Sequence, residues 1–138
     1  MKYLLDTNII SDHYKGASPA LDAWMDAQIE RDLAISAITI LELDRGIRRR
    51  EHRDPTQGAR LRVWLDDAVR PLFAGRVLPV DEHVALVAAG LHVPDPMPDM
   101  DALIAATALT HGLTLVTRNT KDMERTGVAL LNPWALTP

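Results

Sequence analysis

The sequence contains no cysteine among its 138 residues. This absence excludes a disulfide framework, a thiolate metal site and a cysteine nucleophile, and it is consistent with a reducing compartment. No apolar run is long enough to cross a membrane. Asp6 and Asn8 interrupt the N-terminal apolar run before it reaches the length of a signal-peptide core. We therefore expect a cytoplasmic protein.

Signatures of several other function classes are also missing. The 7 glycines are spread singly, so no glycine-rich phosphate loop is present. The 5 histidines show neither an i,i+4 pair nor regular ligand spacing, and we interpret all of them as non-ligands: His13, His52, His83, His92 and His111. No repeat, low-complexity segment or interdomain linker is evident. A chain of this length suits one core, so we expect a single domain over residues 1–138.

The overall charge is acidic, at −4 with a pI near 5.7, whereas a general nucleic-acid binder is usually basic. Bound Mg²⁺ would offset part of an acidic site. Positive charge is also concentrated locally, in five arginines: Arg45, Arg48, Arg49, Arg50 and Arg53. Neighbouring acids dilute this arginine cluster. A solvated helix face and a phosphate-binding surface are therefore both open interpretations of it.

Apolar segments typical of short buried strands alternate with helical patterns. We expect strands at residues 2–5, 33–35, 77–79, 113–117 and 128–131. We expect helices near residues 9–14, 19–30, 36–54, 57–73, 81–91 and 99–111, the third capped by Ser36 or Thr39. This alternation predicts an α/β protein, a three-layer α/β/α fold with a central parallel sheet of four to five short strands.

Four acids lie beside these apolar segments: Asp6, Glu42, Asp101 and Asp122. In parallel sheets, ligands bind outside the carboxyl ends of the strands, so acids that are scattered in the sequence can meet at one edge. Burying a carboxylate is costly unless its charge is compensated. Mg²⁺ and Mn²⁺ select oxygen ligands, and such ions activate water against phosphodiesters. We interpret the chain as a small metal-dependent nuclease in which these four acids are catalytic and Asp6 and Asp101 bind the metal.

Three of these acids, Asp6, Glu42 and Asp101, could instead have structural roles. Asp6 can cap the helix that follows it, since Asp is a favoured N-cap residue. Glu42 can form a capping box with Thr39, because the two residues have the required spacing. Asp101 can cap its own helix or hold a cation there, and Asp99, only two positions away, competes with it for the site.

The segment after residue 116 leaves a further choice open. Asp122 is the acid that we assign to the site, but Asn119 can take its place, or both can contribute through water. The structural interpretation of Asp122 is a loop residue near the start of a short helix. Thr117 and Asn8 are expected to orient the carboxylates by hydrogen bonds.

Five short motifs, in order and at compatible spacing, point to a known family. They lie in residues 4–8 (LLDTN), 36–46 (SAITILELDRG), 101–108 (DALIAATA), 117–119 (TRN) and 132–134 (NPW). Together they resemble the PIN domain over essentially the whole chain and, more narrowly, the VapC toxins of bacterial toxin–antitoxin pairs. Residues 71–79 (PLFAGRVLP), followed by Asp81 and Glu82, resemble the FitB branch of that group.

The resemblance implies a PIN fold, Mg²⁺-dependent endoribonuclease activity and a homodimer. It also implies a VapB-like antitoxin that wraps the toxin and blocks its site, with operator DNA bound through the antitoxin. By motif, Asp6 and Asp101 match the principal metal ligands, and Glu42 matches the helix acid of the family. Asn119 stands where some relatives have Asp, which leaves Asp122 as the nearest acid for the fourth position.

Two other function classes compete with the nuclease interpretation. A receiver-like signalling domain also has a parallel sheet and an acidic Mg²⁺ pocket, but here Asp6 stands alone after the first strand and Asp81 lies in a poor phosphoacceptor setting. A non-catalytic PIN-fold module would grip RNA without cutting it. An acidic cleft facing phosphates is of no use to a pure binder, and we therefore prefer the nuclease.

Overall fold

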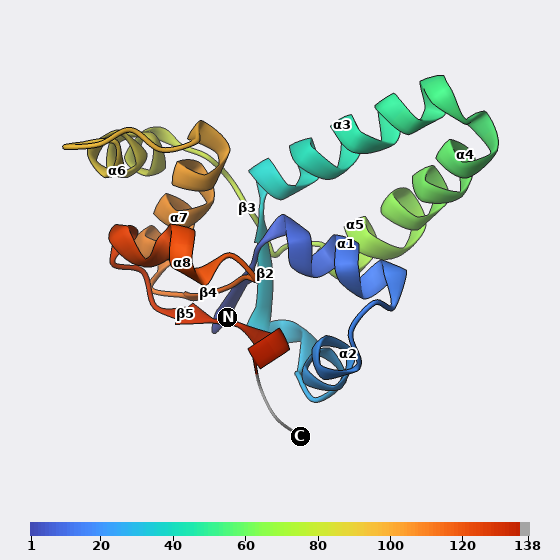
Figure 1. The fold of residues 1–138 in the computed structure, drawn as a ribbon, viewed down its shortest axis with the longest axis horizontal. Helices are drawn as coiled ribbons and strands as arrows, with labels where there is room; N and C mark the ends of the chain where they lie inside the picture. The colour runs from blue at the N-terminus through green and yellow to red at the C-terminus, as the bar shows by residue number, and fades with distance from the viewer. Residues whose placement is uncertain (136–138) are drawn as a thin grey trace.

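The computed structural model describes residues 1–135 and contains one five-stranded parallel sheet (Figure 1). Its strands are β1 (Tyr3–Leu5), β2 (Leu33–Ser36), β3 (Val77–Leu78), β4 (Thr114–Val116) and β5 (Leu130–Leu131). The strand order is β3-β2-β1-β4-β5. The predicted fold class is confirmed. The order differs from the 2-1-3-4-5 order of flavodoxin-like receivers, which removes the topological basis of the receiver alternative.

Helices cover both faces of the sheet. They are α1 (Thr7–Lys15), α2 (Pro19–Asp26), α3 (Ala37–Arg53), α4 (Pro55–Trp64), α5 (Arg70–Leu72), α6 (Glu82–Leu91), α7 (Asp99–His111) and α8 (Thr120–Met123). Short 3₁₀ turns lie at Glu30–Asp32, Glu124–Thr126 and Pro133–Ala135. In Figure 1, α1 and α2 lie on one side of the sheet, and α6, α7 and α8 lie on the other. Among the described residues 1–135, no helix is both long enough and apolar enough to cross a bilayer.

Alternate strand residues supply two separate cores. Leu4, Ala34 and Leu115 pack with Ile104 and Ala108 of α7. Their neighbours Leu5, Ile35 and Val116 point to the opposite face, where they pack with residues of α1, α2 and α3. Both faces of the strands are therefore buried, as expected for a parallel sheet with short, continuously apolar strands.

Two of the predicted helices differ from those in the structure. The helix expected to run to residue 30 ends at Asp26, where the Gln28 side chain donates a 2.9 Å hydrogen bond to the Trp24 carbonyl. That bond satisfies a carbonyl that the helix leaves free at its C-terminus. The helix expected over residues 57–73 is interrupted by a π-helical turn at Leu65–Val69. Pro71 follows this turn, and proline lacks the N–H that a regular α-helix needs.

The third helix is capped by Ser36, whose hydroxyl accepts a 3.0 Å hydrogen bond from the Ile38 N–H. The capping box proposed for Thr39 and Glu42 is wrong, because Thr39 lies inside α3. The helix ends at Arg53, one residue before the predicted end, because Asp54 precedes Pro55 and a residue before proline disfavours helix.

Helices α3 and α4 form an antiparallel hairpin that extends from the sheet (Figure 1). Gly58 of α4 lies against α3 so closely that a Cβ there would stand 2.5 Å from the Glu51 Cα. Arg62 of α4 reaches back to α3, where it pairs with Asp44 and lies 3.1 Å from the Glu51 carboxylate. Close backbone contact and a shared arginine therefore hold the hairpin together.

Candidate active site

Asp6 lies at the carboxyl end of the central strand β1 and is only 5% exposed. Its Oδ1 accepts a 2.7 Å hydrogen bond from the Thr7 N–H, so it also caps α1. Its Oδ2 accepts a 2.8 Å hydrogen bond from the Thr117 hydroxyl. The capping and site interpretations of Asp6 are thus compatible, because one oxygen caps the helix while the other faces the end of β4.

Thr117 connects the ends of β1 and β4. Its fully buried hydroxyl binds Asp6 and accepts a 3.0 Å hydrogen bond from the Asn119 N–H. The Asn8 amide donates to this hydroxyl at 3.3 Å and to Asp6 Oδ2 at 3.4 Å. The hydrogen bonds predicted for Thr117 and Asn8 are confirmed for one carboxylate of the site, that of Asp6.

Glu42 lies in the second turn of α3, half-buried. Its Oε1 accepts a 2.6 Å hydrogen bond from the Thr7 hydroxyl, which also lies 3.1 Å from the Thr39 hydroxyl. Thr7 therefore joins Asp6 and Glu42, through its N–H and its hydroxyl respectively. Sequence reasoning did not single out Thr7, although its place directly after Asp6 was the available signal.

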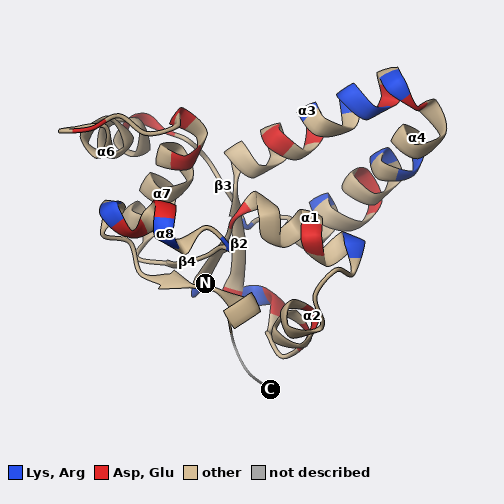
Figure 2. Ribbon diagram, viewed as in Figure 1, with Lys and Arg blue, Asp and Glu red and all other residues tan. Residues whose placement is uncertain are grey.

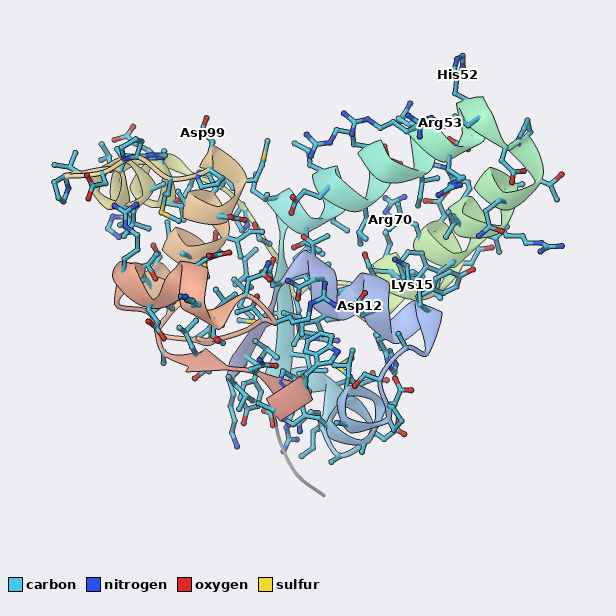
Figure 3. All side chains as sticks on the ribbon, viewed as in Figure 1. Asp12, Lys15, His52, Arg53, Arg70 and Asp99 are labelled. Atoms are coloured by element: carbon cyan, nitrogen blue, oxygen red, sulfur yellow. The ribbon has the colours of Figure 1, made fainter. Side chains whose placement is uncertain are left out.

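Asp101 is half-buried in the first turn of α7. Its competitor Asp99 begins the same helix but points outward, with a side chain 86% exposed and 3.3 Å from His92 (Figure 3). Residues two positions apart on a helix are rotated by roughly 200° from each other. The orientation of α7 therefore directs Asp101, rather than Asp99, toward the other acids.

The segment between β4 and α8 carries the last two candidates. Asn119 precedes α8 and is exposed, and its side chain forms no cap hydrogen bond. Asp122 lies within α8 (Thr120–Met123), also exposed. Its negative charge raises the pKa of Asp101, which places Asp122 in the electrostatic environment of the site.

An ion pair between Arg118 and Asp12 anchors the segment between β4 and α8. The Arg118 guanidinium lies 3.0 Å from the buried Asp12 carboxylate and 5.4 Å from the centre of the Trp134 ring. The Arg118 N–H donates a 3.3 Å hydrogen bond to Asn8. Sequence reasoning missed Asp12 and Arg118 as positioning residues, because they are 106 positions apart. Trp134 itself is partly buried and packs against the core formed with α1, α2 and α3.

The acids of the site repel one another. Burial raises the pKa of Asp6, and the charges of Asp101 and Glu42 raise it further against the lowering effect of its hydrogen bonds. Burial also raises the pKa of Asp101, with added contributions from Glu42 and Asp122. All four predicted acids therefore belong to one electrostatically coupled group at the carboxyl edge of the sheet. A cation bound among them would relieve this repulsion.

The donor set fits a hydrated hard cation. Within residues 1–135, no three His, Cys, Asp or Glu side chains lie close enough together to form a metal cluster. Mg²⁺ does not need such a cage, since it is usually held by one or two carboxylates and keeps several waters. Asp6 and Asp101 are the residues that could supply the oxygen ligands for this mode of binding.

Comparison with known proteins shows the family of the chain. The family model of the PIN domain matches residues 3–129. Toxin FitB of Neisseria gonorrhoeae is 37% identical over 137 residues, which cover 95% of this chain and 97% of FitB. VapC ribonuclease Y4jK of Sinorhizobium fredii is 38% identical over 141 residues, covering 95% of this chain and 96% of that protein.

Solved structures show the same fold. The crystal structure of FitAcB from Neisseria gonorrhoeae aligns with a TM-score of 0.86 at 37% identity, covering 97% of this chain and 99% of the other. A toxin-antitoxin complex from Klebsiella pneumoniae aligns with a TM-score of 0.72 at 28% identity, covering 98% and 100%. The family model, the relatives and the shared fold agree, and the chain belongs to the PIN domain family.

Proposed function

We propose that this chain is a metal-dependent endoribonuclease and the toxin of a type II toxin–antitoxin pair. The observation that carries the proposal is the grouping of Asp6, Glu42, Asp101 and Asp122 at one edge of the sheet. These residues come from four segments that are far apart in the sequence. Burial, with a further contribution from the repulsion of their charges, raises the pKa of Asp6 and Asp101. Relatives named toxin FitB and VapC ribonuclease, similar over almost the whole chain, support the same function.

The roles of the residues follow from their environments. Asp6 and Asp101 would hold Mg²⁺, or Mn²⁺ in its place. When bound, such an ion lowers the pKa of water and stabilises the charge that develops on the phosphate. Glu42, fixed by the Thr7 hydroxyl, and Asp122 orient the attacking water. Thr117 and Asn8 keep the Asp6 carboxylate turned toward the site.

The proposed function implies a protein partner, an antitoxin. A VapB-like antitoxin would neutralise the toxin, and operator DNA would be contacted through that antitoxin rather than through this acidic chain. The resemblance to a solved toxin-antitoxin complex supports this view. We also propose a homodimer, a single domain over residues 1–138 and a cytoplasmic location. Co-purification of a small DNA-binding protein with the chain would test the antitoxin.

The direct test is cleavage of total cellular RNA by purified protein freed of any partner, in Mg²⁺, in Mn²⁺ and in EDTA. The test variant is Asp101→Asn. The matched control is Asp99→Asn, the same change two positions earlier on an exposed face of the same helix. We expect discrete fragments that require metal, vanish with Asp101→Asn and persist with Asp99→Asn. Equal activity of wild type and Asp101→Asn would indicate a contaminant and overturn the assignment.

The same experiment separates the nuclease from a non-catalytic RNA-binding module. RNA binding that survives EDTA, with no cleavage by the folded protein in either metal, would favour the binding module.

A further inference from the structure

Three arginines of α3 share the helix face that carries Glu42. Arg49 and Arg53 follow Glu42 by 7 and 11 positions, which are close to two and three full helical turns. Arg45 lies less than one turn from Glu42, on the adjoining side of this face. The three guanidinium groups thus extend from the candidate active site toward the tip of the hairpin, over roughly 16 Å of helix.

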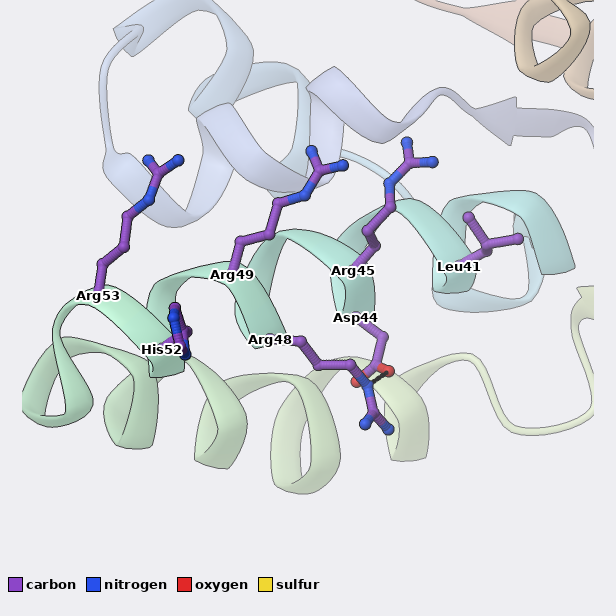
Figure 4. A pocket seen from close by; sticks show the side chains of 7 residues that line it. All are labelled: Leu41, Asp44, Arg45, Arg48, Arg49, His52 and Arg53. Carbon is purple, nitrogen blue, oxygen red and sulfur yellow. Dashed lines mark hydrogen bonds and ion pairs between the residues drawn. The ribbon is translucent and has the colours of Figure 1, made fainter.

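Figure 4 shows these three side chains projecting side by side from successive turns of α3, away from α4. They line a shallow hollow together with Leu41, Asp44, Arg48 and His52. All three arginines are exposed, and none of them forms an ion pair with any other side chain in the described range 1–135. Their charges are therefore available to a ligand.

The other two acids of α3, Asp44 and Glu51, are already paired with arginines. Asp44 binds Arg48 at 2.6 Å and also pairs with Arg62, and these hydrogen bonds lower the pKa of Asp44. Glu51 is held by Arg62 at 3.1 Å. Figure 2 shows that basic residues are concentrated on the outer half of α3. The sequence suggested that neighbouring acids weaken the positive charge of the arginine cluster. Because Asp44 and Glu51 are paired with Arg48 and Arg62, they do little to offset the charges of Arg45, Arg49 and Arg53.

We propose that Arg45, Arg49 and Arg53 form a phosphate-binding ridge that holds the single-stranded RNA leading away from the catalytic acids. This proposal rests on the proposed ribonuclease function. A guanidinium binds phosphate oxygens through paired hydrogen bonds. Successive members of the ridge stand one turn of helix apart, about 6 Å along the axis, a spacing that suits consecutive phosphates of one strand.

The ridge also answers an electrostatic problem of the site. Four acids repel an approaching polyanion, and the whole chain carries a charge of −4. The positive charge of the ridge attracts the RNA strand beside the point of cleavage. The arginines lie next to the catalytic carboxylates and do not neutralise them. No Phe, Tyr or Trp side chain lines the hollow, so stacking of bases on these rings does not contribute there. The ridge therefore binds backbone, with little preference for sequence.

The test compares two double variants in an Asp101→Asn background, so that RNA stays intact. The ridge variant is Arg49→Gln with Arg53→Gln. The matched control is Arg31→Gln with Arg60→Gln, which removes the same charge from two exposed arginines outside the ridge. The probes are labelled single-stranded oligo(A) and oligo(U), titrated over a range of salt concentrations at constant Mg²⁺. Thermal unfolding confirms that each variant is folded.

We expect the ridge variant to bind both RNAs roughly three- to tenfold more weakly than the parent. The slope of log affinity against log salt should shrink by about 0.7 for each lost phosphate contact on a single strand. The control should keep most of the parent's affinity and slope. Equal affinity and slope for the ridge and control variants, with a wild type that cleaves RNA, would overturn the ridge and leave the ribonuclease standing.

Two further outcomes separate the proposals. A wild type that neither binds nor cleaves RNA would overturn the ribonuclease, and the ridge with it. A poly-glutamate peptide, titrated in parallel, serves as the probe for an acidic protein partner. If the ridge variant lost peptide binding while its RNA binding matched the control, the surface would belong to a protein partner, and the RNA ridge would be wrong.

Discussion

The Thr7 hydroxyl donates a 2.6 Å hydrogen bond to the carboxylate of Glu42, 35 positions later in the chain. The N–H of the same threonine donates to Asp6 at 2.7 Å. One residue at the start of α1 thereby sets the distance between an acid at the end of β1 and an acid on α3. The site is organised by this link between elements, in addition to the sheet itself.

Replacing Thr7 with Val should test this link, because Val keeps the shape and the backbone N–H but loses the hydroxyl. We expect the cleavage rate to fall by about tenfold, since Glu42 loses the group that orients it. The free energy of unfolding should fall by about 1 kcal/mol. Rate measurements and urea unfolding check both effects. Thr7→Ser, which restores the hydroxyl, should recover most of the rate, and a Val variant as fast as wild type would show that Glu42 needs no such support.

Asp6→Asn should abolish cleavage while the protein stays folded, and it should change how stability depends on pH. The folded-state pKa of Asp6 is raised above its ordinary value of 3.8, mainly by burial. In metal-free wild type, its contribution to stability is therefore fully present below that value and is lost as pH rises through the folded pKa. The Asn variant cannot ionise at this position.

Urea unfolding of both proteins in EDTA, repeated across acidic and neutral pH, measures this effect. The stability of wild type relative to Asp6→Asn should decline as pH rises above 3.8. A difference that stays constant with pH, or grows in favour of wild type, would contradict the proposed environment of Asp6.

Magnesium should raise the melting temperature of the wild-type protein, because a ligand that binds the folded state alone stabilises it by mass action. The rise should depend on Mg²⁺ concentration and should be strongly reduced in Asp101→Asn. Asp99→Asn should respond as wild type does. If wild type showed no rise and Asp101→Asn were itself more stable, the acids would be a strained pocket that holds metal weakly.

Two substitutions test whether Asp122 or Asn119 fills the fourth position of the site. Asp122→Asn should lower the cleavage rate by tenfold or more, in line with the effect of removing one polar catalytic group. It should also lower the pKa of Asp101, since the charge of Asp122 contributes to raising it. NMR titration of the Asp101 carboxyl carbon measures this pKa. Asn119→Ala is the comparison, and a larger loss of rate there would assign the position to Asn119.

Two glycines of the α3–α4 hairpin should respond in opposite ways to alanine. A Cβ at Gly58 would meet the Glu51 backbone at 2.5 Å, so Gly58→Ala should lower the free energy of unfolding by about 1–3 kcal/mol. A Cβ at Gly46 meets nothing within 4 Å. Gly46→Ala should therefore raise stability by up to about 1 kcal/mol, because alanine is the better helix former. Chemical unfolding of both variants checks the contrast, and equal effects would show that the two helices do not touch at Gly58.

Local patterns in the sequence were sufficient for the fold class and for part of the site. Short apolar strands alternate with amphipathic helices, and this periodicity predicts a parallel sheet with helices on both faces. Asp6 directly follows a strand, and Pro55 marks the end of α3 two residues earlier. These features depend on neighbouring residues alone, so a single sequence contains them.

Tertiary structure decided what depends on the orientation of whole elements. The rotation of α7 turns Asp101 inward and Asp99 outward, although both acids are equally compatible with the helix start. The packing of α1 beside α3 brings Thr7 to Glu42, and the return of α4 places Arg62 on Asp44, leaving the ridge arginines unpaired. The π-helical turn before Pro71 likewise has no clear local signal. Such relationships join residues tens of positions apart, and they form only when the core fixes how each element is placed.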